Sequence, residues 1–168
     1  MNSFKQRFCV DCNKAVETYS DMVYRICFAV AGNREDAGDA FQETFLRLVK
    51  YKNTIESEEH LKAWLIRVAS NCAKTMVTSP WNQRTQGIIQ ESSDKEKGYE
   101  QAENHLLMEL HKLPKKYSLA LYLYYYEEYS IKEIAALLEK KENSIKTLLN
   151  RGRNLLRKRL EEGGSGNE

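Results

Sequence analysis

The stretch that decides the fold is residues 130–160, SIKEIAALLEKKENSIKTLLNRGRNLLRKRL. Ser130 and Glu133 have the spacing of a capping box, in which each side chain accepts a hydrogen bond from a backbone N–H at a helix start. Apolar residues then recur at helical spacing in two stripes, over residues 131–138 and 145–160, and the first stripe is followed by a turn of three polar residues, Glu139, Lys140 and Lys141. Two amphipathic helices joined by so short a turn predict a helix-turn-helix.

The second helix of this pair carries positive charges on its outer face, and no acidic residue lies between Asn143 and Leu160. The cations are Lys146, Arg151, Arg153, Arg157, Lys158 and Arg159. The polar side chains near the helix start, where a recognition helix meets base edges, are Asn143, Ser144, Thr147 and Asn150. Cations without counter-charges are typical of a helix that neutralises DNA phosphates. The alternative interpretation is a solvated face of a helical hairpin, because basic amphipathic helices are common.

Length and composition indicate a globular helical protein. A chain of 168 residues suits one ordinary domain or two small helical ones. Gly and Pro are scarce, with 8 and 2 copies, and long segments without helix breakers favour helix over sheet. The net charge of +2 conceals a basic chain end beside a mixed to acidic middle. No apolar run is long enough for a membrane span and no signal peptide is recognisable, so we expect a cytoplasmic protein with reduced cysteines.

The cysteines and carboxylates do not form a pattern that indicates catalysis or metal binding. Cys9 and Cys12 have the C-x-x-C spacing of half a zinc site, but such a site needs four ligands. Cys27 and Cys72 fall singly on apolar stripes, and the three histidines are scattered. The acidic residues after Asn33 have no nucleophile, histidine or glycine-rich loop beside them. We therefore expect no metal, no cofactor and no enzyme activity.

The first half of the chain predicts three helical segments. Residues 1–31 predict one bent helix or two helices, and Asn33 is the expected cap of a helix that runs to about Tyr51. Its outer face, which is either solvated or docks another protein, carries Asp39, Gln42, Glu43 and Arg47. A helix over residues 58–78 presents a basic and polar surface outside its apolar stripe, formed by Lys62, Arg67, Asn71 and Lys74.

The second half begins with a predicted linker. Residues 80–100 lack a sustained apolar period and are rich in polar residues. A helix follows, and Pro114 is expected to start another that holds a tyrosine cluster. Tyrosines can stack on bases, but we favour packing between helices with the hydroxyl at the surface.

Several motifs in order resemble those of the extracytoplasmic-function sigma factors, the smallest class of bacterial sigma subunits. DAGDAFQETF at residues 36–45 matches the family pattern D-A-x-D-x-x-Q-E-x-F. WLIRVASN at residues 64–71 matches W-L-x-R-x-A-x-N. The second domain of the family opens with L-P and continues through S-x-x-E-I-A and a V-K-like step to R-x-R-x-x-L. Its counterparts here are residues 113–114, 130–135, 145–146 and 151–156.

The resemblance implies an all-α fold of two small helical domains joined by a flexible linker. The domains would be a sigma region 2 bundle at residues 1–79 and a sigma region 4 helix-turn-helix at 102–161, with a linker at 80–101 and a flexible tail at 162–168. The implied function is that of an RNA polymerase sigma factor, and the alternative is a stand-alone helix-turn-helix regulator. The implied partners are core RNA polymerase and promoter DNA, and an anti-sigma factor is usual in the family.

The resemblance also implies roles for individual residues. The residues that would dock on the coiled coil of the polymerase β′ subunit are Asp36, Asp39, Gln42, Glu43 and Phe45. Those that would melt and read the minus-ten element are Thr54, Ser57, His60, Lys62, Arg67, Asn71 and Lys74. Those that would read the minus-thirty-five element beside the β flap are Asn143, Ser144, Lys146, Thr147, Asn150, Arg151 and Arg153.

The chain departs from the family pattern at two places. Gly38 stands where the family often has glutamate, which makes the docking face less acidic. In the turn of the helix-turn-helix, Glu139 and Lys141 stand where glycine and serine are common. The usual left-handed turn residue and N-cap are therefore missing, and Asn143 or Ser144 is the candidate replacement cap.

Overall fold

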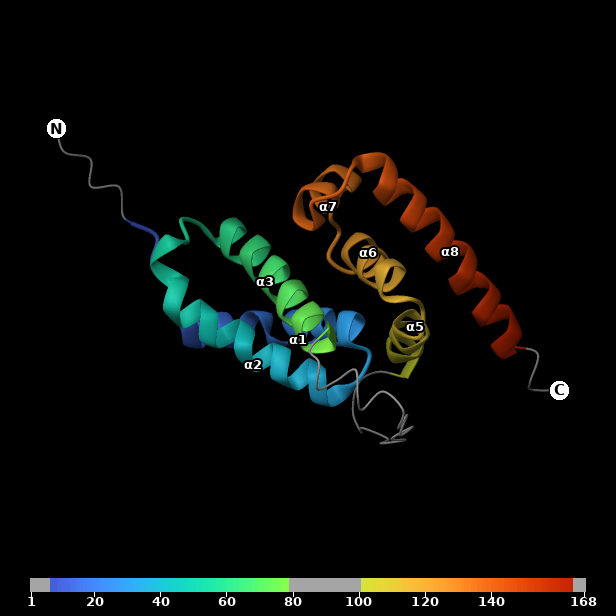
Figure 1. The fold of residues 1–168 in the computed structure, drawn as a ribbon, viewed down its shortest axis with the longest axis horizontal. Helices are drawn as coiled ribbons and strands as arrows, with labels where there is room; N and C mark the ends of the chain where they lie inside the picture. The colour runs from blue at the N-terminus through green and yellow to red at the C-terminus, as the bar shows by residue number, and fades with distance from the viewer. Residues whose placement is uncertain (1–6, 79–100, 165–168) are drawn as a thin grey trace.

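The computed structural model describes residues 7–78 and 101–164, and these residues form helices and no strand. The elements are α1 (Cys12–Ala31), α2 (Arg34–Tyr51), a 3-10 turn η1 (Lys52–Thr54), α3 (Glu58–Thr78), α5 (Gln101–His111), α6 (Lys115–Tyr125), α7 (Ile131–Leu138) and α8 (Glu142–Gly164). The predicted all-α fold is confirmed, with α1, α2 and α3 in one bundle and α5 to α8 in a second (Figure 1). Residues 80–100 of the predicted linker lie outside the described residues.

Local capping sets the ends of the first two helices. Asp11 accepts hydrogen bonds from two backbone N–H groups in the first turn of α1, and Gly32 ends the helix in the left-handed region at φ +78°. Between these caps α1 is continuous, so residues 7–31, the described part of the N-terminal segment, hold one helix. Asn33 caps α2 as predicted, since its Oδ1 accepts the backbone N–H of Asp36 at 2.9 Å.

α1 packs against both other helices of the N-terminal bundle. Val23, Ile26 and Cys27 of α1 are fully buried, as is Leu65 of α3. Burial raises the pKa of the Cys27 thiol to about 12, so this cysteine acts as a small apolar side chain, and Cys72 is equally buried at 1% exposure. The prediction that these two cysteines belong to the core is confirmed.

The helix-turn-helix forms where the sequence predicts it. Ser130 and Glu133 make the capping box, with N–H to side-chain oxygen distances of 2.8 and 3.2 Å. Glu139 takes the left-handed conformation itself, at φ 55°, and the backbone N–H of Lys140 closes the turn on the Ala135 carbonyl at 2.9 Å. A non-glycine residue thus adopts the turn conformation for which the family commonly has glycine.

The predicted replacement cap of α8 is wrong. The helix begins at Glu142, so Asn143 and Ser144 already lie inside its first turn and cannot occupy the flanking cap position. The first-turn hydrogen bond runs from the Ile145 N–H to the Lys141 carbonyl at 3.1 Å. The helical backbone therefore starts two residues too early for Asn143 to cap it and three too early for Ser144.

A close approach between α8 and α6 requires a glycine. A Cβ placed on Gly152 would lie 2.9 Å from Cδ1 of Leu121 and 3.2 Å from Cβ of Tyr117. Both neighbours are buried, Leu121 at 0% and Tyr117 at 8% exposure, so neither side chain has space to move aside. Tyr122 of the same helix is also fully buried, which confirms packing for this tyrosine, but its hydroxyl is not at the surface as predicted, because it donates to Glu127.

The end of α8 is held by an ion pair. Nε of Arg159 lies 3.3 Å from Oε2 of Glu109 on α5, and Glu109 also pairs with Lys112 at 2.9 Å. The helix continues through Gly164, so residues 162–164 of the predicted flexible tail are helical. The sequence-based assignment of Arg159 to the outer cationic face is wrong in this respect, because its guanidinium faces α5.

The two bundles pack against each other. α1 contacts α6 and α5, and α3 contacts α7. The ring of Phe28 on α1 meets the ring of His111 on α5 edge to face, with centroids 4.8 Å apart. Burial, with the positive charge of Arg25, lowers the pKa of His111 to about 4, so the ring is neutral at neutral pH and packs as an aromatic group. The buried side chains form one continuous core across both bundles.

The glycine in the α6–α8 contact generates a stability prediction. We expect Gly152→Val to destabilise the full-length chain by about 1–3 kcal/mol, because the added carbons overpack a filled contact. Gly38→Ala is the control, since a Cβ there meets nothing within 4 Å, and it should stabilise the chain by about 0.5–1 kcal/mol through helix propensity. Urea unfolding followed by circular dichroism measures both changes. A Gly152→Val chain as stable as the wild type would contradict the close approach.

Candidate nucleic-acid and protein interfaces

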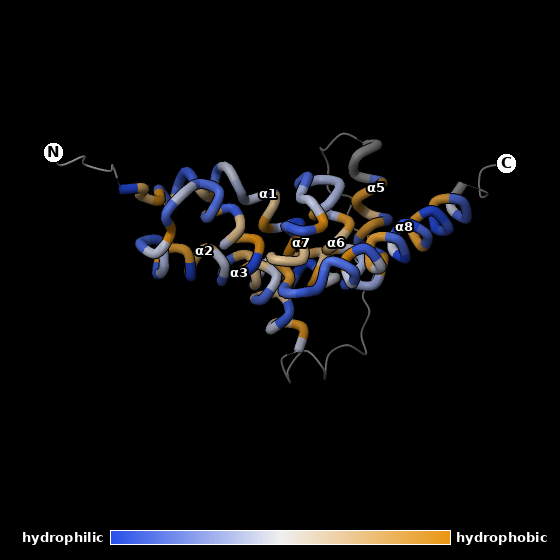
Figure 2. Tube along the Cα trace, turned by 90° about the horizontal axis from the view of Figure 1, so that it is seen from above, coloured by the Kyte–Doolittle hydropathy of each residue, from blue (hydrophilic) through white to orange (hydrophobic). Residues whose placement is uncertain are grey.

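The exposed face of the N-terminal half of α8 carries every predicted contact to the minus-thirty-five element. These seven residues, all exposed, are Asn143, Ser144, Lys146, Thr147, Asn150, Arg151 and Arg153. Ile145 and Leu149 lie on the opposite side and are fully buried against the rest of the C-terminal bundle. Hydrophilic and hydrophobic stretches accordingly alternate along α8 (Figure 2). The helix thus has one buried face and one polar, cationic face, as predicted.

The charges on this face are largely uncompensated. Among residues 7–78 and 101–164, no ion pair involves Lys146, Arg151, Arg157 or Lys158. Arg153 lies at the edge of the face, where its Nη1 donates to the hydroxyl of Tyr125 at 3.2 Å. Unpaired cations on an exposed helix attract a polyanion, and each one that meets a phosphate releases condensed counterions.

A second polar surface runs along α3. His60, Arg67, Asn71 and Lys74 are exposed and lie at positions i, i+7, i+11 and i+14, which share one helical face. The half-buried Trp64 occupies position i+4 of the same stripe. Trp64 packs partly against the core, and its spacing from His60 places its exposed part on the polar face. The surface therefore combines two cations, an amide, an imidazole and an indole edge.

The loop between α2 and α3 joins this surface at its N-terminal end. Ile55 is 2% exposed and anchors the loop in the core. Ser57 Oγ accepts the N–H of His60 at 3.0 Å, so the hydroxyl caps α3. His60 Nδ1 accepts the N–H of Glu56 at 3.2 Å, which leaves Nε2 of the neutral ring as a donor. Thr54 donates to the Tyr51 carbonyl at 2.7 Å. The loop is thus ordered by the polar side chains predicted to read DNA.

Lys62 is not part of the α3 polar face. It points to the other side of the helix, where Nζ lies 3.1 Å from Oε2 of Glu127 in the C-terminal bundle. The ammonium also lies over the ring of Tyr129, 5.3 Å from its centroid. Glu127 in turn accepts the hydroxyl of the buried Tyr122 at 2.8 Å. Lys62 therefore links the two bundles in this structure.

The outer face of α2 is a mixture of charge and exposed apolar surface. Asp39 and Gln42 are exposed, and Glu43 pairs with Arg47 at 2.9 Å. Leu46 and Val49 continue this face and are 66% and 56% exposed. The sequence interpretation missed both, although they lie four and seven residues after Gln42. Large apolar side chains beside charges on one exposed helix face are typical of a protein-docking surface.

Two of the predicted docking residues also have structural roles. Oδ2 of Asp36 accepts a hydrogen bond from Nδ2 of Asn33 at 2.9 Å, which places this carboxylate at the start of α2. Phe45 is half-buried, and its ring packs edge to face on Phe41 with centroids 5.0 Å apart. Asp36 therefore stabilises the start of the helix that carries the candidate docking surface, and Phe45 packs below that surface.

The part of the chain that the structure describes holds no group of three or more His, Cys, Asp or Glu side chains that could bind a metal ion. Cys9 is exposed and Cys12 is half-buried, and both are free thiols. Within the same residues, none of the helices has the length and apolar character that a membrane span requires.

Comparisons with known proteins identify both bundles. The sigma-70 region 2 family model matches residues 15–83, and the sigma-70 region 4 model matches residues 104–156. The extracytoplasmic-function sigma factor SigW of Bacillus subtilis is 28% identical over 163 residues, covering 88% of this chain and 87% of that protein. SigV of the same bacterium is 25% identical and covers 82% of this chain and 83% of its own length.

Solved structures share the fold. The sigma factor RpoE, in its complex with the anti-sigma factor NepR from Bartonella quintana, superposes with a TM-score of 0.71 at 19% identity, over 89% of this chain and 96% of that one. CnrH, solved with the cytosolic domain of CnrY, gives a TM-score of 0.61 at 16% identity, over 90% and 88% of the two chains. Both regions occur in order along one chain, so the protein belongs to the extracytoplasmic-function group of the sigma-70 family and is an RNA polymerase sigma factor.

Proposed function

We propose that this sigma factor binds core RNA polymerase through the outer face of α2 and reads promoter DNA with two separate surfaces. The observation that carries the proposal is the exposed face of the N-terminal half of α8, where all seven predicted contacts are exposed and the cations have no carboxylate partner among the described residues. A surface of this kind is suited to duplex DNA. The α3 face and its loop supply the second surface, and the two bundles correspond to the proposed region 2 and region 4 domains.

The minus-thirty-five element is the proposed ligand of α8. A recognition helix enters the major groove with its N-terminal residues against base edges. Lys146 and Thr147 lie there, whereas Arg151 and Arg153 lie further along, where they meet phosphates or the β flap. Sequence preference would then depend on the first pair of residues and sequence-independent affinity on the second.

The minus-ten element is the proposed ligand of the α3 face. Opening a promoter requires that bases leave the duplex and that the displaced strand is held. Arg67 and Lys74 offer charges for phosphates, and Asn71 offers hydrogen bonds for base edges. Trp64 adds an aromatic ring on which an unstacked base can lie. His60 extends the surface toward the loop.

Core polymerase is the proposed partner of the α2 face, through the coiled coil of its β′ subunit. The exposed Leu46 and Val49 provide apolar contact area, and Asp39, Gln42 and Glu43 surround them with polar groups. Apolar contacts at the centre and polar ones at the rim are the usual arrangement of a protein interface. We also propose an anti-sigma partner, because RpoE, which shares this fold, was solved in complex with the anti-sigma factor NepR.

The free chain is proposed to be closed. The Lys62–Glu127 ion pair and the contact between α3 and α7 hold one predicted minus-ten residue against the C-terminal bundle. Reading two promoter elements that lie apart on DNA requires the bundles to separate. Core polymerase would supply the free energy for separation by binding both regions at distant points. Isolated protein should accordingly bind promoter duplex weakly.

Run-off transcription tests the proposed function. Core polymerase with the wild-type chain should initiate on promoter-bearing DNA, whereas core alone should not. Glu43→Lys should weaken core binding at least about tenfold, which corresponds to about 1.4 kcal/mol, because the reversed charge lies beside the apolar docking residues. Glu17→Lys, the same reversal at an exposed position on α1, is the control and should bind core normally. A chain that binds promoter duplex tightly without core polymerase, and that does not initiate transcription when core polymerase is present, would favour a stand-alone regulator.

The closed form generates a second prediction. Glu127→Gln removes the charge that holds Lys62 and keeps an acceptor for the Tyr122 hydroxyl. We expect the isolated variant to bind single-stranded minus-ten DNA about two- to fivefold more tightly, since a partly exposed ion pair contributes about 0.5–1 kcal/mol. Fluorescence anisotropy measures the affinity. Adding Lys62→Ala should abolish the gain, and equal affinities of the wild type and Glu127→Gln would show that the pair does not mask Lys62.

A further inference from the structure

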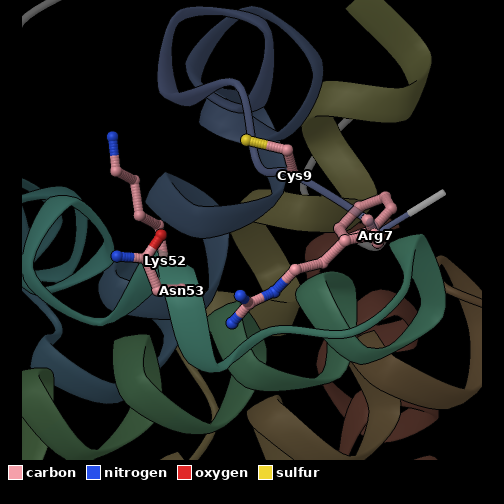
Figure 3. A pocket seen from close by; sticks show the side chains of 5 residues that line it. Arg7, Cys9, Lys52 and Asn53 are labelled. Carbon is pink, nitrogen blue, oxygen red and sulfur yellow. The ribbon is translucent and has the colours of Figure 1, made fainter. Parts of the chain in front are cut away.

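A surface cavity lies between the segment that precedes α1 and the turn that follows α2 (Figure 3). Its volume is about 310 Å³, and it is lined by Arg7, Phe8 and Cys9 on one side and by Lys52 and Asn53 of η1 on the other. This volume lies at the lower end of the range for small-molecule sites, about 300–1,000 Å³. The cavity is therefore of a size for one small ligand group such as a single nucleotide.

The lining of the cavity favours an anion. It contains a guanidinium, an ammonium, a carboxamide, a thiol and an aromatic ring, and it contains no carboxylate. Within residues 7–78 and 101–164, neither Arg7 nor Lys52 forms an ion pair. Figure 3 shows Arg7 extending from the segment before α1 toward the turn that carries Lys52 and Asn53. In the same view the Lys52 side chain extends away from the Arg7 guanidinium, so the two cations lie apart along the cavity and suit successive phosphates of a strand. Arginine can bind such a phosphate through two parallel hydrogen bonds.

The position of the cavity indicates which phosphate it binds. Asn53 directly precedes Thr54, the first residue of the loop proposed to read the minus-ten element. Ser57 is four residues beyond Asn53, so at most about 14 Å of extended chain separates the cavity from the start of α3. A strand that rises about 3.4 Å per nucleotide covers this distance in about four nucleotides. A displaced strand that lies on the loop is thus within reach of the cavity.

We propose that this cavity binds one nucleotide of the displaced single strand, next to the segment read by the loop and α3. The Arg7 guanidinium and the Lys52 ammonium meet the two phosphates that flank this nucleotide, and the base meets Asn53 and the ring of Phe8. The residues before α1 then belong to the promoter-reading surface of this sigma factor. The inference rests on the proposed function of the α3 face, and it adds a second contact point on the same strand.

The test uses the complex of full-length chain and core polymerase. The DNA is a fork junction, duplex upstream and single-stranded through the minus-ten element, built on a promoter that the wild-type complex transcribes. Arg7→Ala and Lys52→Ala should each weaken fork binding several-fold and flatten its logarithmic salt dependence by about 0.7, the value for one phosphate contact on a single strand. The double variant should flatten it by about 1.4. Lys14→Ala, an exposed cation on the first turn of α1, is the control and should change neither quantity.

Cys9 provides an independent readout inside the cavity. In a Cys12→Ser chain, Cys9 is the exposed thiol of the described residues, because Cys27 and Cys72 are buried. Alkylation of Cys9 by iodoacetamide should slow when the complex holds the fork junction. A fully duplex fragment that carries only the minus-thirty-five element should leave the alkylation rate unchanged.

Three results would overturn the inference. In the first, Arg7→Ala and Lys52→Ala behave like Lys14→Ala, and Cys9 is alkylated equally fast with and without the fork junction. In the second, the two variants weaken binding of core polymerase itself and leave the salt dependence of fork binding intact, which would assign the cavity to a protein contact. In the third, the wild-type complex transcribes no promoter, which would overturn the proposed function and, with it, the inference that rests on that function.

Discussion

Burial of α1 between the two bundles is the constraint on which the rest of the structure depends. Its buried side chains pack on α2 and α3 within the N-terminal bundle, and the helix also contacts α6 and α5 of the C-terminal bundle. The Phe28–His111 ring contact and the Lys62–Glu127 ion pair lie in the same junction between the bundles. Apolar burial supplies most of the free energy of such packing, and the polar contacts add geometric specificity.

This arrangement would let one chain hold the two proposed DNA-reading surfaces without using both at once. The cationic face of α8 and the polar face of α3 are both exposed, so neither surface is covered by its own bundle. Lys62 is the exception, because its ammonium is bound to Glu127. The distance between the surfaces is set by packing of the bundles in the free chain, and it would be set by polymerase in the complex. A closed free form would keep the sigma factor from occupying DNA before it meets core polymerase.

Sequence reasoning predicted the features that depend on neighbouring residues. The capping box at Ser130, the cap at Asn33 and the two faces of α8 follow from short-range hydrogen bonds and helical periodicity. The cap of α8 was predicted wrongly, because the sequence did not show that Glu139 would adopt the left-handed conformation or that the next helix would begin as early as Glu142. The backbone conformation of a short turn such as that at Glu139 depends on how the two helices beside it pack.

Long-range packing was not predictable from the sequence. Nothing in the spacing of Lys62 distinguishes it from Arg67 or Lys74, yet its partner is a carboxylate in the other bundle. Leu46 and Val49 were not recognised as exposed, because an apolar residue next to a buried stripe can point into the core or out of it. Three-dimensional packing decides such cases, since it determines which side of a helix the neighbouring elements cover.

The distance between the two bundles in solution tests the closed form most directly. Spin labels at Asp21→Cys on α1 and Lys132→Cys on α7, both exposed positions, report this distance in a chain whose Cys9 and Cys12 are replaced by serine. Pulsed electron–electron double resonance should give a single narrow distribution of label-to-label distances for the free chain and a clearly longer distance when core polymerase is bound. A broad distribution in the free chain, or the same distance with and without polymerase, would contradict the account.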